Sequence, residues 1–219
     1  MEKPIIQKKN IVSLMESRFI KVYDLQYAPD RHYFDASRRS LDNLVAHKSD
    51  EDFQNMLPDA VSCFVILRVG EDAPKLLTSY EYRYPAGQFL LSPPAGLIDP
   101  EDAELDDPIL TAAIREIKEE TGLDVKDTDR VFLVNPLLFS SPGMTDESNA
   151  LACAVISVKD TDSLTQTGAV GSEKFDGFRL LTQEEAREIL KRGRDEHGNF
   201  FSVYTWCALM YFVSGMWEV

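Results

Sequence analysis

The sequence predicts a mixed α/β fold, in which a β-sheet packs between helices and a few antiparallel strands precede it. Three apolar runs have the length of strands, and the first is densely apolar, as a central strand is. One amphipathic helix lies between the first run and the other two. These runs are Ala60–Val69, Arg130–Phe139 and Asn149–Val158. Strands on both sides of a central helix, closed by a later helix, are typical of an α/β sandwich.

The N-terminal region predicts a small antiparallel sheet. Its runs mix apolar and polar residues in near alternation, as half-exposed strands do. They are Ile11–Met15, Arg18–Leu25 and His32–Arg39. Two or three such strands are rarely stable alone, so we expect region 1–57 to pack on the following domain, 58–219, or to form a dimer interface. Residues 40–58 are polar and charged, which indicates a loop or a short helix.

The other elements follow from local signals. Two further strands, Pro74–Tyr84 and Phe89–Ser92, precede the central helix. After the last apolar strand, Thr182 and Glu185 have the spacing of a capping box, which starts a helix over Leu181–Lys191. The closing helix covers about Phe200–Met216.

That last segment is uncharged from Phe200 to Trp217 and follows three basic residues, so a membrane anchor is an alternative. Ser202, Thr205 and Ser214 dilute its apolar character, and this favours a buried or interface helix.

The central helix is predicted over Pro108–Thr121. Proline suits the first helical turn, Asp106 and Asp107 can cap it, and Gly122 stands where a glycine ends a helix. At about 100° per residue, three carboxylates share one arc of the helix. They are Glu116, Glu119 and Glu120. The apolar face, roughly a third of a turn away, is expected to pack on the sheet through Leu110, Ile114, Ile117 and Thr121.

Three carboxylates so close together repel one another, and like charges at i, i+4 weaken a helix. A solvated acidic face explains the spacing alone. A divalent cation among the carboxylates explains it as well, and all-oxygen ligands favour Mg²⁺ or Mn²⁺.

The flanking residues favour the cation. The run R-E-I-K-E-E-T-G-L, from Arg115 to Leu123, with P-A-G upstream, resembles the Nudix box, G-x5-E-x7-R-E-U-x-E-E-x-G-U, over 96–123. The second half matches at every specified position. Eighteen residues separate Gly96 from Arg115 where the pattern has thirteen, so the first Glu of the box falls on Asp102 or on Asp107, depending on the end from which one counts.

Two further segments narrow the resemblance to the branch that hydrolyses ADP-ribose and nucleoside diphosphate sugars. E-Y-R-Y-P, from Glu81 to Pro85, resembles its Q-x-R-x-P segment, in which the Arg contacts phosphate; Arg83 could equally pair with a neighbouring acid. S-S-P-G-M-T-D-E-S, with Gly143 and Glu147, is similar to its S-P-G-x-S/T-x-E segment, which faces substrate. A plain turn is the alternative there.

The resemblance implies a Nudix-type α/β/α sandwich and Mg²⁺ or Mn²⁺ held by Glu116, Glu119, Glu120 and the Ala95 carbonyl. Gly96, Arg115 and Gly122 are structural positions of the box. The general base of this branch often lies on a late loop, here Gln166–Gly177, so Glu173 is the candidate and Glu119 the substitute. The expected substrate is ADP-ribose or a related nucleoside diphosphate sugar, hydrolysed by a homodimer.

Two rival functions remain at this point. The first is another Nudix hydrolase that cleaves dinucleoside polyphosphates or nucleoside triphosphates. The second is a non-catalytic nucleotide sensor, which the intact carboxylates of the box disfavour.

Composition excludes other classes of function. The net charge of −14 argues against nonspecific nucleic-acid binding, which needs a basic surface. Three cysteines without paired spacing predict reduced thiols. The N-terminus lacks the apolar run of a secretory signal. We therefore expect a cytoplasmic protein without membrane or nucleic-acid partners.

Overall fold

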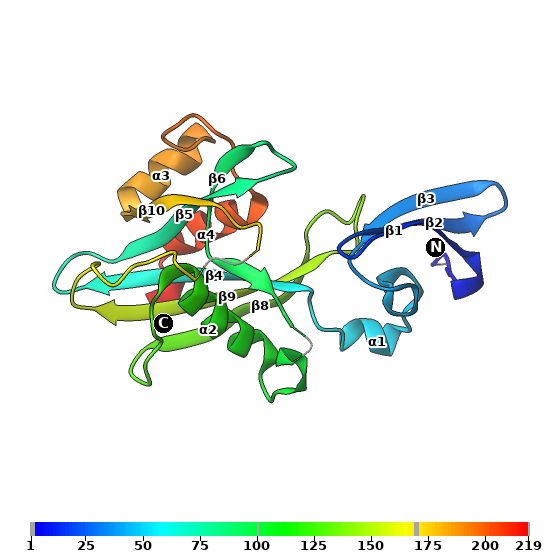
Figure 1. Cartoon of the computed structure of the whole chain (residues 1–219), viewed down its shortest axis with the longest axis horizontal. Coiled ribbons are helices and arrows are strands. Elements are labelled where there is room, and N and C mark those ends of the chain that lie inside the picture. The colour runs from blue at the N-terminus through cyan, green and yellow to red at the C-terminus, as the bar shows by residue number, and fades with distance from the viewer. Residues whose placement is uncertain (1–2, 100, 169–170, 219) are drawn as a thin grey trace. The chain divides into compact units, whose positions relative to one another are not determined.

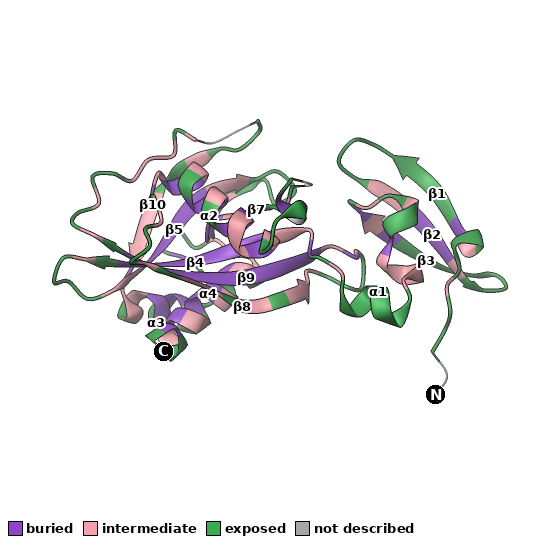
Figure 2. Ribbon diagram, turned by 90° about the horizontal axis from the view of Figure 1, so that it is seen from below, coloured by how far each residue is buried: buried purple, intermediate pink, exposed green. Residues whose placement is uncertain are grey.

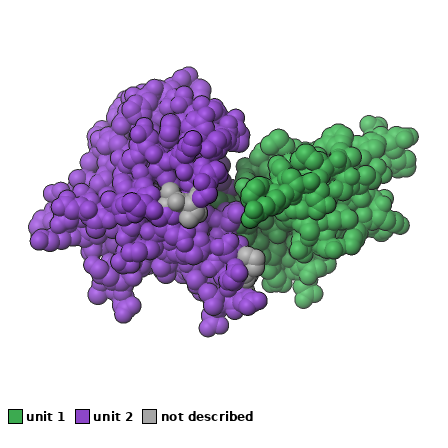
Figure 3. All heavy atoms as spheres, in the orientation of Figure 1, with its two compact units in different colours: residues 1–59, 137–149 green, residues 60–136, 150–219 purple. Residues whose placement is uncertain are grey.

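In the computed structural model, which describes residues 3–99, 101–168 and 171–218, the chain folds into two compact units (Figures 1 and 3). One unit contains residues 1–59 and 137–149, and the other contains 60–136 and 150–219. Pro100 of the predicted box and positions 169–170 of the predicted late loop lie outside the described residues.

The first unit contains the predicted antiparallel sheet. Its strands pair in the order β1-β2-β3. They are β1 (Ile11–Glu16), β2 (Lys21–Ala28) and β3 (Arg31–Ser37). Ile11, Tyr23, Leu25 and Leu44 form its small buried core. The polar stretch that follows forms short helices: η2 (Leu41–Asn43), η3 (Val45–His47) and α1 (Asp50–Gln54), after η1 (Lys8–Asn10) near the N-terminus.

Segment 137–149 belongs to this first unit although it lies about a hundred residues further along the chain. The Ala36 amide donates to the Met144 carbonyl at 3.0 Å, and the Asp59 amide donates to the Ser148 carbonyl at 3.0 Å. The N-terminal strands are therefore held by a loop that carries part of the predicted substrate-binding motif.

The second unit is built on a seven-stranded sheet in the order β10-β5-β4-β9-β8, with β6 paired to β5 and β7 paired to β4. Strands β4 and β5 are antiparallel, whereas β4 and β9 point the same way, so the predicted mixed sheet is confirmed (Figure 1). The strands are β4 (Ala60–Val69), β5 (Lys75–Arg83), β6 (Gln88–Ser92), β7 (Ala95–Leu97), β8 (Arg130–Phe139), β9 (Ser148–Val158) and β10 (Phe175–Leu181).

Helix α2 (Pro108–Thr121) covers one face of this sheet, and α3 (Gln183–Arg192) and α4 (Val203–Ser214) cover the other (Figure 2). Strand β4 shows why both faces are needed, because its side chains alternate between them. Val61, Cys63, Val65 and Leu67 join the α2 side of the core, whereas the Phe64 ring lies 5.7 Å from that of Tyr211 on α4.

Helix α4 is shorter than predicted. Ser202 caps it through the Thr205 amide, and Gly215, in the left-handed conformation, ends it. Among the described residues, no helix is both long enough and apolar enough to cross a membrane.

Strand β10 was not predicted, because its first half falls in the late loop. Asp176 and Gly177 interrupt the apolar alternation there, and a register shift lies between Phe175 and Phe178. The strand exists because it pairs with β5, and that partner is distant in sequence.

Candidate active site

Helix α2 has the predicted bounds and the predicted signals at its ends. The Asp107 carboxylate accepts from the Leu110 amide at 3.2 Å, Pro108 occupies the first turn, and Gly122 adopts φ 76°. A Cβ at Gly122 would lie 2.5 Å from the Thr165 side chain, so this glycine also permits a close approach of the loop beyond β9.

The predicted faces of α2 need a correction. Glu116 and Glu120 lie on the buried face beside Ala113 and Ile117, at 6% and 5% exposure, whereas Ile114 is 39% exposed. The sequence predicts an apolar face that packs on the sheet and a separate acidic face. In the structure, small alanines pack on the sheet, and two of the carboxylates reach inward beside them.

Gly96 provides the space for one of these carboxylates. A Cβ at this position would lie 1.9 Å from the Glu116 carboxyl carbon and 2.0 and 2.3 Å from its two oxygens. Next to it on β7, the Ala95 amide lies 3.4 Å from Glu120 Oε1. The backbone of β7 therefore lies directly against both buried carboxylates.

Arg115 ties the box together. Its Nη1 donates to Glu116 Oε1 at 2.6 Å and lies 3.5 Å from Glu119 Oε2. Its Nη2 donates to the Leu97 carbonyl at 2.9 Å and to Asp102 Oδ2 at 2.8 Å. Of the two acids that could occupy the first acidic position of the box, Asp102 therefore contacts the arginine, and Asp107 caps the helix.

The buried carboxylates are costly to ionise without a partner ion. Burial, with the charges of Glu81 and Glu116, raises the pKa of Glu120 to about 9. Burial also raises the pKa of Glu116 to about 7, although Arg115 opposes it. Because Glu173 contributes to both shifts, its carboxylate lies within electrostatic reach of the pair.

These residues fit a hard divalent ion. The side chains offer only oxygen donors, which suit Mg²⁺ or Mn²⁺, and a cation would stabilise the ionised carboxylates against the burial and repulsion that raise both pKa values. Within the described part of the chain, no three acidic, histidine or cysteine side chains are already gathered as a metal-binding group. The assignment of Glu116, Glu119, Glu120 and the Ala95 carbonyl as ligands stays a prediction.

Arg83 and Glu173 are brought together by backbone contacts. The Tyr82 amide donates to the Lys174 carbonyl at 2.8 Å, and the Tyr84 hydroxyl donates to the Ser172 carbonyl at 3.3 Å. The residues on either side of Glu173 are thus bound to the residues on either side of Arg83. Arg83 itself is paired with Glu81 at 2.5 Å, as the sequence alternative allowed.

Gly143 and Glu147 lie in the first unit and contact the N-terminal strands. The Tyr33 hydroxyl donates to the Gly143 carbonyl at 2.8 Å, and Arg38 Nε donates to Glu147 Oε1 at 2.8 Å. Their role in substrate binding stays a prediction.

The contact between the loop beyond β9 and the end of α2 is not among the features predicted from the sequence. The Thr165 amide donates to the Thr121 carbonyl at 3.0 Å, and a Cβ at Gly168 would lie 2.3 Å from the Glu119 carbonyl oxygen. Gly168, shortly before Glu173, is the signal of this contact in the sequence.

The fold and the site together define an α/β protein in which the carboxylates of one helix pack against a strand that contains glycine. Residues 56–204 match the NUDIX domain, and the chain belongs to that family. Over 110 residues it is 40% identical to a protein of Caenorhabditis elegans named putative nudix hydrolase 2, covering 50% of this chain and 41% of that protein. Over 95 residues it is 34% identical to a Saccharomyces cerevisiae protein named ADP-ribose pyrophosphatase, covering 42% and 37%.

A solved structure described as an ADP compounds hydrolase matches all of this chain and 98% of its own, with a TM-score of 0.61 and 18% identity. This match shows the fold. The chain spans 41% and 37% of the lengths of the two relatives named above.

Proposed function

We propose that this protein is a divalent-metal-dependent pyrophosphohydrolase acting on nucleoside diphosphates linked to a second group, with ADP-ribose as the preferred substrate. Water adds to one phosphorus of the pyrophosphate, and the bond from that phosphorus to the bridging oxygen breaks. The bridging oxygen leaves on the other phosphate, so that ADP-ribose gives AMP and ribose 5-phosphate.

One observation carries the proposal: Glu116 and Glu120 are buried together against the backbone of β7, with pKa values raised to about 7 and about 9. A protein without a cation for this site would gain stability from replacing such residues with apolar ones. Buried carboxylates with strongly raised pKa values are typical of functional sites.

When bound, Mg²⁺ would neutralise charge on the pyrophosphate oxygens and lower the pKa of the attacking water. The protein residues have separate tasks. Arg115 orients Glu116 through its 2.6 Å contact and fixes the β7 end through Leu97. Glu173 accepts the proton from water, with Glu119 as the substitute, and both are exposed enough to meet solvent.

Substrate preference is supported by Arg83 and by the names of similar proteins. The Arg83 side chain is 46% exposed on β5, and its guanidinium can exchange Glu81 for a phosphate. Among similar proteins, one relative is named ADP-ribose pyrophosphatase and one solved structure is described as an ADP compounds hydrolase. These support an ADP-containing substrate.

The test is hydrolysis of a panel containing ADP-ribose, ADP-glucose, UDP-glucose, GDP-mannose, diadenosine polyphosphates, NADH and dNTPs, with Mg²⁺ or with a chelator. Metal-dependent turnover that is fastest with ADP-ribose is the expected result. Faster turnover of another compound would replace the substrate and keep the mechanism. Tight nucleotide binding without turnover of any compound would instead indicate a nucleotide sensor.

We also propose that region 1–57 mediates a homodimer. The face of the N-terminal sheet opposite its core exposes Val12, Met15 and Phe34 at 43%, 46% and 58%. Asp24 lies between Val12 and Phe34 in the register, so these apolar side chains flank a polar centre. Several exposed apolar side chains on one face are characteristic of interfaces. Light scattering should give twice the chain mass, and Phe34→Lys should shift it toward the monomer. A monomeric wild-type chain at micromolar concentration would exclude the dimer.

A cytoplasmic location is part of the proposal. Cys63, Cys153 and Cys207 are free, and the first two are buried in the sheet core, as expected for a reducing compartment. Microscopy of a tagged chain tests this, and accumulation in an oxidising compartment would contradict it.

A further inference from the structure

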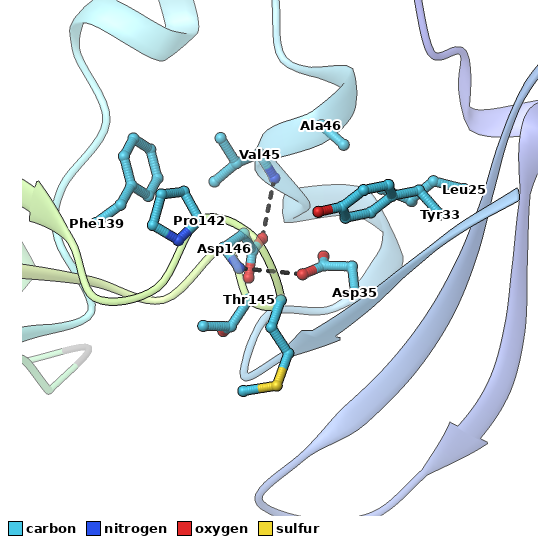
Figure 4. Close-up of a pocket in the computed structure, with 10 residues that line it drawn as sticks. Leu25, Tyr33, Asp35, Val45, Ala46, Phe139, Pro142, Thr145 and Asp146 are labelled. Atoms are coloured by element: carbon cyan, nitrogen blue, oxygen red, sulfur yellow. Dashed lines mark hydrogen bonds between the residues drawn. The ribbon is translucent and has the colours of Figure 1, made fainter.

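The first unit contains a cavity of its own, lined by residues of that unit. It has a volume of about 210 Å³ and lies between strands β2 and β3, helix η3 and segment 137–149 (Figure 4). Its walls are mainly apolar, formed by Leu25, Val45, Phe139, Pro142 and Met144. This volume is below the roughly 300–1,000 Å³ typical of sites for drug-sized ligands, so it suits a compact molecule.

Two aspartates line the same cavity, and each is more than nine-tenths buried. Asp35 Oδ1 accepts from the Asp146 amide at 3.0 Å, and Asp146 Oδ2 accepts from the Val45 amide at 3.2 Å (Figure 4). The second oxygen of each carboxylate, Asp35 Oδ2 and Asp146 Oδ1, is buried and has no hydrogen-bond partner within the described residues. Buried polar atoms normally have such a partner, so two residues that line the cavity each have an unsatisfied acceptor.

The nearby arginine does not balance these acids. Arg39 Nη2 lies 2.9 Å from Asp59 Oδ2, whereas Arg39 Nε lies 3.9 Å from Asp146 Oδ2. One guanidinium is thus shared between Asp59 and Asp146, and Asp35 is a third carboxylate beside them. Burial and the charge of Asp146 raise the pKa of Asp35 to about 6, so a negative charge there is destabilised.

We propose that this cavity binds a small organic cation, an ammonium or amidinium group on a compact apolar body, whose charge Asp35 and Asp146 hold. The apolar walls receive the body, and the N–H donors satisfy the two free oxygens. A phosphate is excluded by like charge. A whole nucleoside diphosphate sugar is too large for this volume, so the proposed ligand is distinct from the proposed substrate.

Calorimetry on the full-length protein at pH 8 tests this with benzamidine and cyclohexylamine, against benzamide and cyclohexanol as neutral compounds of similar shape. Because hydrogen bonds to charged groups contribute roughly 1.5–3 kcal/mol, the cations should bind about tenfold or more tightly than the neutral compounds. Equal affinity, or tighter binding of the neutral compounds, would overturn the proposal.

Variants locate the site. Asp35→Asn and Asp146→Asn should each weaken benzamidine binding about tenfold, while Glu51→Gln, an exposed acid on α1, should leave it unchanged. If either aspartate variant fails to fold, Ala46→Leu narrows the cavity without touching the acids and should abolish binding. Full affinity in Ala46→Leu, or loss of affinity in Glu51→Gln, would place the cation elsewhere and overturn the proposal.

Discussion

The Glu116 carboxyl carbon lies 1.9 Å from the point where a Cβ on Gly96 would stand. Strand β7 can therefore contain only glycine at this position if Glu116 is to keep its place. The carboxylate is the far end of a flexible side chain, so a methyl group would displace it without moving the backbone of α2. A substitution at Gly96 should therefore change the geometry of the site and leave the stability of the fold nearly unchanged.

Gly96→Ala should fold normally and lose activity. Displacement of Glu116 by an ångström or more should lower kcat by about a hundredfold, with a thermal midpoint within a few degrees of the wild type. Steady-state kinetics across a Mg²⁺ titration, with thermal unfolding, measures both quantities. Leu97→Ala is the matched control, because Leu97 is the next residue on β7 and its side chain is exposed. Wild-type kcat in Gly96→Ala would show that the position of Glu116 does not matter.

Glu120→Gln should abolish turnover and stabilise the metal-free protein. Folding raises the pKa of Glu120 from 4.5 to about 9, so the folded state binds this proton more tightly than the unfolded chain does. The stability that the bound proton contributes is full below pH 4.5 and is lost as pH rises through about 9. The neutral glutamine does not suffer this loss, so unfolding of the metal-free variant should depend less on pH between 5 and 9.

Mg²⁺ should narrow the difference in stability between the two proteins. At a hundred times its dissociation constant the ion adds about 2.7 kcal/mol to the wild type, or roughly 5–10 °C in thermal midpoint. The variant should gain little. A chelator should abolish the Mg²⁺-induced shift of the wild type, and an equal Mg²⁺-induced shift in both proteins would exclude Glu120 as a ligand.

Much of this fold could be predicted because its signals are local. The caps of α2, the capping box of α3 and the apolar runs of β4, β8 and β9 are each contained in a short stretch. Strand β10 and the placement of segment 137–149 could not be predicted, because both depend on partners far away in the sequence. At the site, the box identified the carboxylates of α2. It could not choose between Asp102 and Asp107, because that choice depends on how the inserted residues fold back onto Arg115.

Gly168→Ala should impair catalysis through the placement of a loop. The backbone of this residue needs no positive φ, but a Cβ would lie 2.3 Å from the Glu119 carbonyl oxygen and 3.0 Å from its Cα, and neither atom can yield easily. The loop must then move from α2 and take Glu173 with it. We expect kcat to fall about tenfold to a hundredfold with little change in KM. Asp162→Asn, an exposed change in the same loop, is the control. An unchanged kcat, or a change confined to KM, would show that this contact does not position the base.

Asp35→Asn should stabilise the protein at neutral pH. Asp35 accepts one hydrogen bond, from the Asp146 amide, and its other oxygen has no partner within the described chain. Its pKa is raised from 3.8 to about 6. The folded state therefore holds the proton more tightly, so the contribution of Asp35 to stability is full below pH 3.8 and is lost as pH rises through about 6. This difference in pKa between the unfolded and the folded state corresponds to a loss of stability of roughly 3 kcal/mol at most.

Asparagine keeps the acceptor for the Asp146 amide and carries no charge, so it does not incur this loss. Urea unfolding should show Asp35→Asn and the wild type equally stable near pH 4, and the variant more stable at pH 7.5 by an amount up to roughly 3 kcal/mol. Asp42→Asn, an exposed change in the same unit, should not reproduce the pH dependence. A variant less stable than the wild type at pH 7.5 would mean that the ionised Asp35 already has a cationic partner in the empty protein. The two unsatisfied oxygens would then no longer indicate a ligand, and the same unfolding curves that test the pKa of Asp35 would also test the cavity.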